Sequence, residues 1–549
     1  MTATFADLKA AAGLYGVRVQ RKPNVADVLL LPCPKCGETA EVMEQSDSEG
    51  NGSGQVVYWC DCDPRWQRTS PEELKRTWER QGKRPVGEVE GEGLTRYART
   101  DAGNAERFRD LYGDLARYVH QLETWRLWTG KRWADDVTGK VEQLALLVAR
   151  DRLSVAAALG DDRERHEEAK WALSSESVDR RRDLLAAART LPELACLPAD
   201  FDRDALLLNC GNGTLDLRTG ELLTHAPERM QSKLIPVAYD PAATCPRWEQ
   251  FLGEVFDGCD AVADFVQRAV GYSLTADGRE QCLFLLHGGG CNGKSVFLRV
   301  LLRLLADYGA ATDFATLTLD RERQAGIRND IARLCGTRLV TASETSDGVR
   351  FSEGILKSLT GGDRVTARLL HKEFFEFTPA FKLWLACNHR PRVRDSSEAF
   401  WRRIRLIPFT VSFRGREDKG LADALAKELP GILAWGVRGC REWLEAGDLL
   451  APAEVLAATQ DYRQAEDVLA QFLADCCVTG EGLWASARDL FAAYCQWCES
   501  NGERATSQRR FGEALGERGF ERRPGTTREA RGRVEWAGIG LLGEREAAA

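Results

Sequence analysis

The sequence predicts a multidomain α/β protein, and three observations lead to this fold class. A chain of 549 residues is too long for one hydrophobic core, so several domains are expected. Hydrophobic residues make up 44% and charged residues 29% of the chain, which is typical of globular proteins. Between Leu283 and Phe409, strand-like apolar runs alternate with helical stretches, and this alternation indicates an α/β domain.

Composition argues against membrane and secreted proteins. The chain has no apolar run of about eighteen residues, and its N-terminus lacks a basic region before an apolar run. We therefore expect a cytoplasmic protein with no membrane contact. Most of the 17 cysteines are scattered singly through apolar segments, as expected of reduced, buried thiols. The net charge is −8, so any contact with nucleic acid must come from local basic surfaces.

The pattern divides the chain into successive segments. We expect a cysteine-rich domain in residues 1–80, a linker in 81–96, a mainly helical domain with a small β unit in 97–270, an α/β core in 271–412, a helical extension in 413–480 and a small module in 481–549. Within the small β unit, Gly211-Asn212-Gly213 predicts a hairpin between two apolar strands.

The first segment has cysteines with the spacing of zinc ligands. Cys33 and Cys36 form a C-x2-C pair, and Cys60 and Cys62 follow across a loop rich in serine and glycine. Four thiolates suit tetrahedral Zn²⁺, which would stabilise a segment too small for a core of its own. The C-x-C half is atypical, and free thiols are the alternative.

A glycine-rich loop opens the α/β core. In HGGGCNGKS, Gly288-x4-Gly293-Lys294-Ser295 lies between a strand ending at His287 and a helix. Such a loop directs backbone N–H groups at phosphates, while Lys294 would contact the β- and γ-phosphates and Ser295 would hold Mg²⁺. The predicted nucleotide-binding residues are Gly288, Gly289, Gly290, Cys291, Asn292, Gly293, Lys294, Ser295 and Val296. The alternative is an ordinary glycine-rich turn with a solvated lysine.

Polar residues follow the later strands of this core. Glu344 comes at the end of RLVTAS and would position Mg²⁺ or polarise water, and Asn388 ends FKLWLAC and could orient that water. Arg402 and Arg403 precede the last strand and suit an arginine finger that reaches a neighbouring subunit. Each residue has a structural alternative: a surface acid, a turn residue and a solvated helix end.

The last segment predicts a DNA-binding module. ASARDLFAAYCQWCESNG and SQRRFGEALGERGF predict two helices, the second with Phe511 and Leu515 inward and Arg509 and Arg510 outward, and a basic hairpin follows. Nine arginines and five glutamates lie between residues 503 and 533, a local basic surplus. This order is typical of a winged helix, and a solvated helical cap is the alternative. We expect Cys495-x2-Cys498 to belong to the core.

Several motifs resemble one known family in their order. HGGGCNGKS, RLVTASET, LKSLTGGDRVTAR, HKEFFEFTPAFKLWLACNHRPRV and AFWRRIRLIPF resemble the successive motifs of superfamily 3 helicases, and most of all the phage and plasmid primase–helicase family, which is related to the poxvirus primase–helicase. The likeness runs from about residue 97 to the C-terminus. It implies an AAA+-type ATPase that assembles into a hexameric ring, binds ATP between subunits and translocates on single-stranded DNA, typically 3′ to 5′.

The resemblance also implies roles for individual residues. Lys294 and Ser295 match the Walker A pair, Glu344 the Walker B acid, Asn388 the sensor, and Arg403, with Arg402 beside it, the finger.

This sequence departs from the family at Walker B. Many superfamily 3 motors carry two adjacent acids there, whereas Glu344 lies between a serine and a threonine, with Asp347 close by. Which carboxylate holds Mg²⁺ is left open.

The family's pore hairpin would fall at residues 366–377, in TARLLHKEFFEF. Arg368, His371 and Lys372 would contact phosphates of the strand in the channel without regard to sequence. A solvent-facing hairpin with a basic tip is the alternative.

We therefore expect an ATP-driven replicative DNA helicase of a phage, prophage or plasmid, acting on single-stranded and forked DNA. Primer synthesis is not expected, because Asp61-x-Asp63 overlaps the cysteines and leaves no room for a primase domain, so a separate primase would be recruited. Two other functions are open: an initiator that melts an origin with ATP, and a non-motor DNA-binding ATPase scaffold.

Overall fold

A computed structural model describes most of the chain. The described residues are 97–319, 329–344, 348–368, 374–395, 397–524 and 534–542, with the backbone of five strands between residues 19 and 69. The chain divides into two compact units: Met1–Asp204 with Gly211–Thr214 and Leu223–Leu234, and Ala205–Cys210 with Leu215–Leu222 and Ile235–Ala549. No helix in these described ranges is long and apolar enough to cross a membrane.

The first unit begins with a five-stranded antiparallel sheet whose strands follow one another in sequence order. They are β1 (Val19–Gln20), β2 (Val28–Pro32), β3 (Thr39–Ser46), β4 (Gly52–Cys60) and β5 (Asp63–Thr69). The predicted zinc ligands Cys33, Cys36 and Cys62 lie outside the described residues, and only the backbone of Cys60 is described. Zinc binding therefore stays a prediction.

The rest of the first unit combines helices with a small sheet. The helices are α3 (Asp101–Tyr112), α4 (Lys140–Ala156), α5 (Asp162–Ser175) and α6 (Val178–Ala188). The sheet has the order β8-β7-β6-β9, with β6 (Ala116–Val119), β7 (Thr124–Trp128), β8 (Trp133–Asp135) and β9 (Ala195–Cys196). The helical character is as predicted, but the sheet was not foreseen. All five residues of β7 are half-buried, so the strand lacks the alternation that would reveal it.

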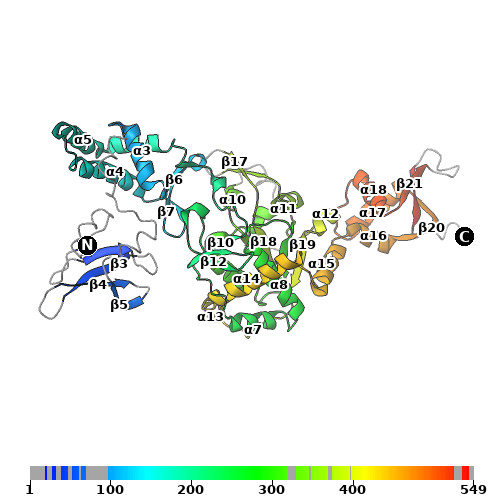
Figure 1. The fold of residues 1–549 in the computed structure, drawn as a ribbon. Coiled ribbons are helices and arrows are strands. Elements are labelled where there is room, and N and C mark those ends of the chain that lie inside the picture. Colours follow the sequence, from blue (N-terminus) through cyan, green and yellow to red (C-terminus); the bar gives the residue numbers. More distant parts are fainter. Residues whose placement is uncertain are drawn as a thin grey trace. The chain divides into compact units, whose positions relative to one another are not determined.

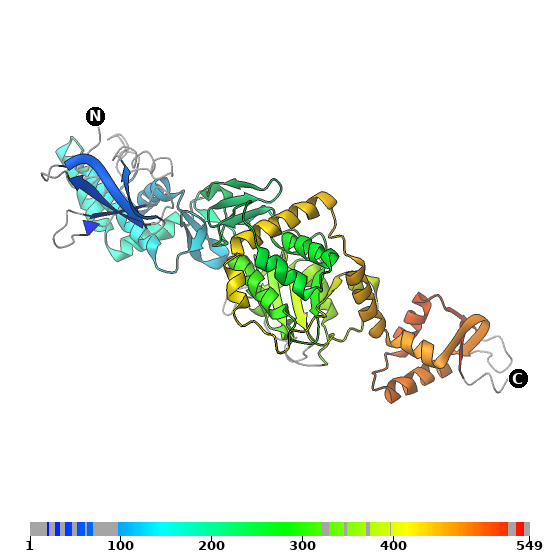
Figure 2. The same cartoon turned by 90° about the horizontal axis from the view of Figure 1, so that it is seen from below.

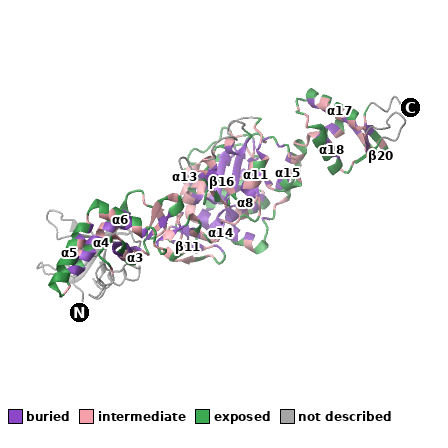
Figure 3. Cartoon of the chain, turned by 90° about the horizontal axis from the view of Figure 1, so that it is seen from above, coloured by how far each residue is buried: buried purple, intermediate pink, exposed green. Residues whose placement is uncertain are grey.

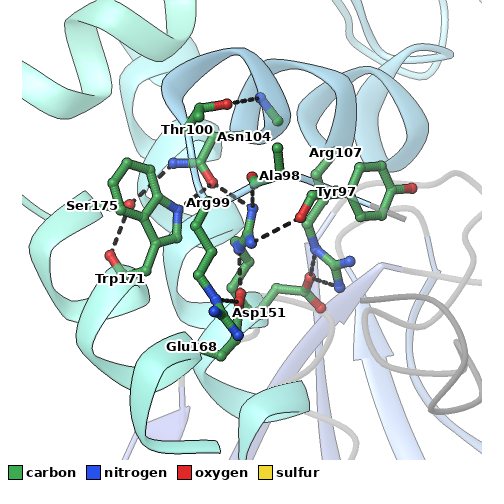
Figure 4. A network of polar contacts seen from close by, with 12 residues as sticks. Tyr97, Ala98, Arg99, Thr100, Asn104, Arg107, Asp151, Glu168, Trp171 and Ser175 are labelled. Carbon is green, nitrogen blue, oxygen red and sulfur yellow. Dashed lines mark hydrogen bonds and ion pairs between the residues drawn. The ribbon is translucent and has the colours of Figure 1, made fainter. Parts of the chain in front are cut away.

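Buried charges connect three of these helices (Figure 4). Arg152 of α4 is fully buried and donates through Nε to Glu168 of α5 at 2.5 Å and through a terminal nitrogen to Asn104 of α3 at 3.0 Å. Beside it, Arg107 of α3 donates through Nε to Asp151 of α4 at 2.5 Å. A buried charge is tolerated only when it is paired, so these contacts fix how the three helices pack.

A three-stranded sheet, β10-β11-β12, follows in the chain. Its strands are β10 (Leu207–Cys210), β11 (Gly213–Asp216) and β12 (Glu221–Leu223). Neighbouring strands β10 and β11 are joined by Gly211 and Asn212, which confirms the hairpin predicted from these residues.

A parallel five-stranded sheet forms the centre of the second unit. Its order is β14-β15-β18-β13-β19, with β13 (Leu283–His287), β14 (Gly309–Ala311), β15 (Leu339–Ser343), β18 (Lys382–Cys387) and β19 (Ile404–Pro408). All six residues of β18 are buried, as expected where helices cover both faces of a parallel sheet. This sheet confirms the predicted α/β core.

Alternate residues of β13 enter two different cores. Phe284 and Leu286 belong to a core shared with α7 (Pro246–Val255), α8 (Asp260–Ser273), α9 (Lys294–Leu305) and α14 (Leu429–Ala446). Leu283 and Leu285 belong to a second core that includes residues of α11 (Glu353–Thr360) and α12 (Glu398–Trp401). Figures 1 and 2 show helices against the strands, and Figure 3 shows how fully the strands are buried.

Helices follow the sheet and lead to the C-terminal module. They are α13 (Leu421–Ala426) and α15 (Ala453–Ala465), on either side of α14. The module consists of α16 (Val468–Cys476), β20 (Cys477–Ser486), α17 (Ala487–Ser500), α18 (Gln508–Glu517), β21 (Glu521–Pro524) and β22 (Val534–Leu541), with the sheet order β20-β22-β21. Both predicted helices and the hairpin are confirmed, and Phe511, Leu515 and Cys498 are buried as expected. Cys495, which was also predicted to lie in the core, is only half-buried.

Candidate nucleotide-binding site

The glycine loop joins the end of β13 to the start of α9. Its backbone is close-packed: a Cβ at position 288 would lie 2.1 Å from the carbonyl oxygen of Phe409, and one at position 293 would lie 2.9 Å from Val255. Gly293 also has φ +87°, a left-handed conformation that favours glycine. These two positions therefore need glycine, and α9 begins directly after the loop, at Lys294.

Lys294 is the buried cation of this loop. Its Nζ donates to the carbonyl oxygen of Gly288 at 2.6 Å, to Asn292 Oδ1 at 2.9 Å and to Asn388 Oδ1 at 3.1 Å. Burial lowers the pKa of Lys294, and the nearby Cys387 and Glu344 oppose this shift. Since all three acceptors are neutral oxygens, an anionic ligand would be a stronger partner for this ammonium group.

Glu344 and Asn388 meet at the carboxyl ends of neighbouring strands. Glu344 follows β15, and its Oε2 accepts hydrogen bonds from the backbone N–H groups of Asn388 and His389, both at 3.0 Å. Its Oε1 is buried and has no hydrogen-bond partner among the described residues. A buried carboxylate oxygen without a partner is costly, and a metal ion or a water molecule would satisfy it.

The structure thus brings the predicted Lys294, Glu344 and Asn388 together. Asn388 lies between the other two, with its side chain on Lys294 and its backbone on Glu344. Ser295 and Cys291 are exposed next to Lys294, where a ligand in the loop could reach them. The second candidate acid, Asp347, lies outside the described residues.

Arg402 and Arg403 lie at the opposite end of the sheet. They connect α12 to β19, and the carbonyl oxygen of Arg403 accepts a hydrogen bond from the N–H of Leu283 at 2.7 Å, at the start of β13. The length of a five-residue strand, about 16 Å, therefore separates them from the glycine loop. Burial and the adjacent Arg402 lower the pKa of Arg403. These arginines cannot reach the loop of their own chain.

Two strands form the arms of the predicted hairpin. They are β16 (Val365–Arg368) and β17 (Phe374–Phe377), which pair antiparallel. The guanidinium of Arg368 lies 5.1 Å from the ring centroid of Phe374, whose side chain is 62% exposed. His371 and Lys372 at the tip lie outside the described residues. The arms are confirmed, and the contacts of the tip stay a prediction.

The other predicted DNA contacts belong to α18 of the C-terminal module. Arg509 and Arg510 are both exposed, and Arg509 donates to Glu513 at 2.9 Å one helical turn later. They do not take part in the arrangement around Lys294.

The structure adds His287 to the residues predicted from sequence. It ends β13, directly before the loop, and its pKa is lowered to about 4 by burial, and further by Arg390, Lys294 and His389. His287 is therefore a neutral imidazole near neutral pH. Its place at a strand end beside the glycine loop was visible in the sequence, but its burial was not.

The fold and the site together define a multidomain α/β protein with a cluster suited to an anionic ligand at the carboxyl edge of a parallel sheet. Three family models match the chain: "D5 N terminal like" at residues 105–257, a family of unknown function at 286–403, and "Poxvirus D5 protein-like" at 464–524.

Curated relatives come from large DNA viruses. A putative helicase of Acanthamoeba polyphaga mimivirus is 28% identical over 55% of this chain and 34% of its own length. A putative helicase of Frog virus 3 is 27% identical over 48% of this chain and 29% of its own length. A putative primase of African swine fever virus is 27% identical over 40% of this chain and 24% of its own length. The match thus spans about a third or less of each relative. These matches make the chain similar to the poxvirus D5 protein-like family and to putative helicases and primases of large DNA viruses.

Among solved structures, the apo C-terminal region of NrS-1 aligns with 80% of this chain and 99% of its own, at 9% identity and a TM-score of 0.45.

Proposed function

We propose that this chain is an ATP-dependent replicative DNA helicase of superfamily 3, encoded by a phage, prophage or plasmid. The observation that carries this proposal is the buried Lys294, held by neutral oxygens at the start of α9 between the glycine loop and Asn388. Similarity to putative helicases and primases of large DNA viruses supports DNA as the substrate on which the energy of ATP is spent.

The residues around the loop fit a triphosphate with Mg²⁺. The hydroxyl of Ser295 and the unpartnered Oε1 of Glu344 are oxygen ligands of the kind Mg²⁺ prefers, and the bound metal would neutralise charge on the phosphates. Lys294 would exchange its neutral acceptors for phosphate oxygens, which leaves the Asn388 carbonyl able to orient a water molecule. Glu344 would hold the metal or polarise that water, with Asp347 as the second candidate acid.

The arginines require a second copy of the chain. Arg402 and Arg403 lie a full strand length from their own loop, so they can complete a site only in an adjacent subunit. This supports a ring with ATP between subunits, which we propose to be a hexamer. Electron microscopy with a slowly hydrolysed ATP analogue would count the subunits.

The hairpin and the C-terminal module supply candidate DNA contacts. The exposed Phe374 beside Arg368 suits stacking on bases, and His371 and Lys372 would contact phosphates. The C-terminal order of helices and antiparallel strands suits a winged helix, with Arg509 and Arg510 on the exposed face of α18. Single-stranded and forked DNA are the proposed substrates.

The remaining parts of the proposal concern the N-terminus and the domain limits. Cys33, Cys36, Cys60 and Cys62 would bind one Zn²⁺, and primer synthesis would come from a separate protein. We keep the predicted domain limits 1–80, 81–96, 97–270, 271–412, 413–480 and 481–549 as part of this proposal.

The test is ATP hydrolysis by the full chain with and without single-stranded DNA, compared with Lys294→Ala. We expect DNA to stimulate turnover and Lys294→Ala to reduce it by about a hundredfold or more, because a preorganised charge on the phosphates is lost. Hydrolysis that DNA does not stimulate would favour the non-motor ATPase scaffold. Protection of a duplex repeat in footprinting, without unwinding, would favour the origin-melting initiator. Full activity in Lys294→Ala would reject the nucleotide site.

A further inference from the structure

We propose that helix α15 couples the nucleotide site of a subunit to the arginines that the same subunit offers its neighbour, with Tyr462 as the central positioning residue. This inference rests on the proposed function, and it concerns how the two ends of one subunit communicate. Nothing in the motif pattern assigns a role to α15.

One face of α15 makes all the relevant contacts. Four residues with the spacing i, i+3, i+4 and i+7 lie on one side of this helix: Thr459, Tyr462, Arg463 and Glu466. The last of them, Glu466, is the residue that caps the C-terminus of the helix. Gln460 and Asp461, which follow Thr459 in sequence, are exposed. The apolar Val455 and Ala458 on this face pack against the two cores of the second unit. The four polar residues instead each have a hydrogen bond or ion pair with a residue outside the helix.

The first partner of this face is the segment that follows Asn388. The hydroxyl of Tyr462 donates to the carbonyl oxygen of Pro391, three residues after Asn388. Glu466 accepts through Oε2 from the N–H of Val393 at 2.8 Å. Since Asn388 contacts both Lys294 and Glu344, a change in the ligand at the loop would be transmitted to this segment.

The second partner is α12, which carries the arginines. The ring of Tyr462 packs edge-on against Trp401, with centroids 5.1 Å apart, and Trp401 directly precedes Arg402. One residue along α15, Arg463 pairs with Glu398 at the start of α12, at 2.6 Å. Both ends of α12 are therefore in contact with α15.

Tyr462 touches both partners at once and is fully buried. Burial raises the pKa of its hydroxyl far above the ordinary value, so the hydroxyl keeps its proton and remains the donor to Pro391. Thr459 fixes the helix against β19, since its hydroxyl accepts from the N–H of Leu406 at 3.0 Å. A shift of the segment after Asn388 must therefore move Tyr462, and with it the arginine end of α12.

The experiment compares Tyr462→Phe, which removes only the hydroxyl, with the wild-type full chain. We expect unchanged nucleotide affinity, a turnover reduced by about five- to tenfold, and a Hill coefficient for ATP that falls to about 1, because a coupling of ordinary size between sites is lost. Affinity is measured by calorimetry and turnover by steady-state hydrolysis over a range of ATP concentrations.

A charge exchange provides an independent variant that does not disturb the core. Arg463→Glu should lower the Hill coefficient in the same direction, and the double variant Arg463→Glu with Glu398→Arg should restore it, because the ion pair is re-formed with its charges exchanged. Asp461→Asn, on the exposed face of the same helix, is the matched control and should behave as wild type.

The outcomes separate this inference from the proposed function. If the wild type does not hydrolyse ATP, the proposed function fails. If the wild type hydrolyses ATP with a Hill coefficient of 1, or if Tyr462→Phe keeps the wild-type turnover and Hill coefficient, the coupling is wrong. A Tyr462→Phe variant that loses affinity and melting temperature together would also overturn it, because the residue would then be only structural.

Discussion

Two lysines are buried at opposite ends of the central sheet and are held in the same way. Lys294, at the carboxyl edge, donates to three neutral oxygens. Lys382, at the start of β18 and so at the amino edge, donates to the carbonyl oxygen of Thr275 at 2.7 Å, to its hydroxyl at 3.3 Å and to the carbonyl oxygen of Ala380 at 3.2 Å. Burial lowers the pKa of both.

The surroundings of the two lysines differ. Lys294 lies beside the exposed Ser295 and the unpartnered Oε1 of Glu344, so a ligand can enter and replace its acceptors. Lys382 is enclosed, with its ammonium 4.3 Å from the ring centroid of Tyr272. Near it lies Arg338, another buried cation, which donates to backbone carbonyl oxygens. Under the proposed function, Lys294 acts as a binding group because its acceptors can be replaced, whereas Lys382 holds chain segments together.

The largest expected effect concerns Arg403, which lies at the same amino edge of the sheet as Lys382. It tests whether this edge also acts in catalysis. Arg403→Ala should reduce ATP turnover by about a thousandfold while nucleotide still binds, because an arginine supplied to a neighbouring site stabilises the transition state there. Steady-state hydrolysis and calorimetric nucleotide binding measure the two quantities.

Mixing provides the control for this prediction. Arg403→Ala keeps an intact glycine loop and Lys294→Ala keeps intact arginines, so a mixture of the two inactive variants should regain part of the activity. Unchanged turnover in Arg403→Ala would show that the amino edge is only structural.

A smaller effect is expected from Lys382→Ala, and it concerns stability. The change leaves a cavity and unpaired carbonyl oxygens, so it should lower the free energy of unfolding by about 2–4 kcal/mol while the nucleotide dissociation constant stays the same. Urea unfolding and nucleotide binding are measured side by side with Lys294→Ala. For that variant we expect weaker nucleotide binding with little change in the free energy of unfolding. A loss of nucleotide affinity in Lys382→Ala would contradict the distinction between the two lysines.

The smallest effect concerns pH at the carboxyl edge. The pKa of His287 is about 4 in the folded chain and near 6.5 in an unfolded one, so protons bind more tightly to the unfolded chain. Its contribution to stability is therefore complete above about pH 6.5 and is lost as the pH falls towards 4.

Replacing the imidazole of His287 removes its contribution to the pH dependence of stability. Urea unfolding of His287→Asn between pH 7 and pH 5 should show a shallower loss of stability than the wild type. An identical slope for the two proteins would mean that His287 titrates normally.

The sequence predicted the residues at the carboxyl edge because strand ends in a parallel sheet meet there. Lys294, Glu344 and Asn388 each follow or adjoin an apolar run, and topology brings them together without further information. The position of Arg403 before its strand likewise predicted that it would lie apart from the loop.

Features that depend on burial were not predicted. Lys382 is the first residue of a strand, and nothing in FKLWLAC distinguishes a buried lysine from an exposed one. The role of Tyr462 depends on contacts with Pro391 and Trp401, which are 71 and 61 residues away in the chain. Neither local pattern nor motif spacing carries such long-range information.

The position of α15 has a practical consequence for fragments of this protein. β19 is an edge strand of the sheet, and an edge strand with unpaired N–H groups can pair with another chain and aggregate. The N–H of Leu406 is covered by Thr459 of α15. A fragment cut at residue 412 would expose this strand, whereas one that continues through Glu466 would keep it covered and remain dispersed.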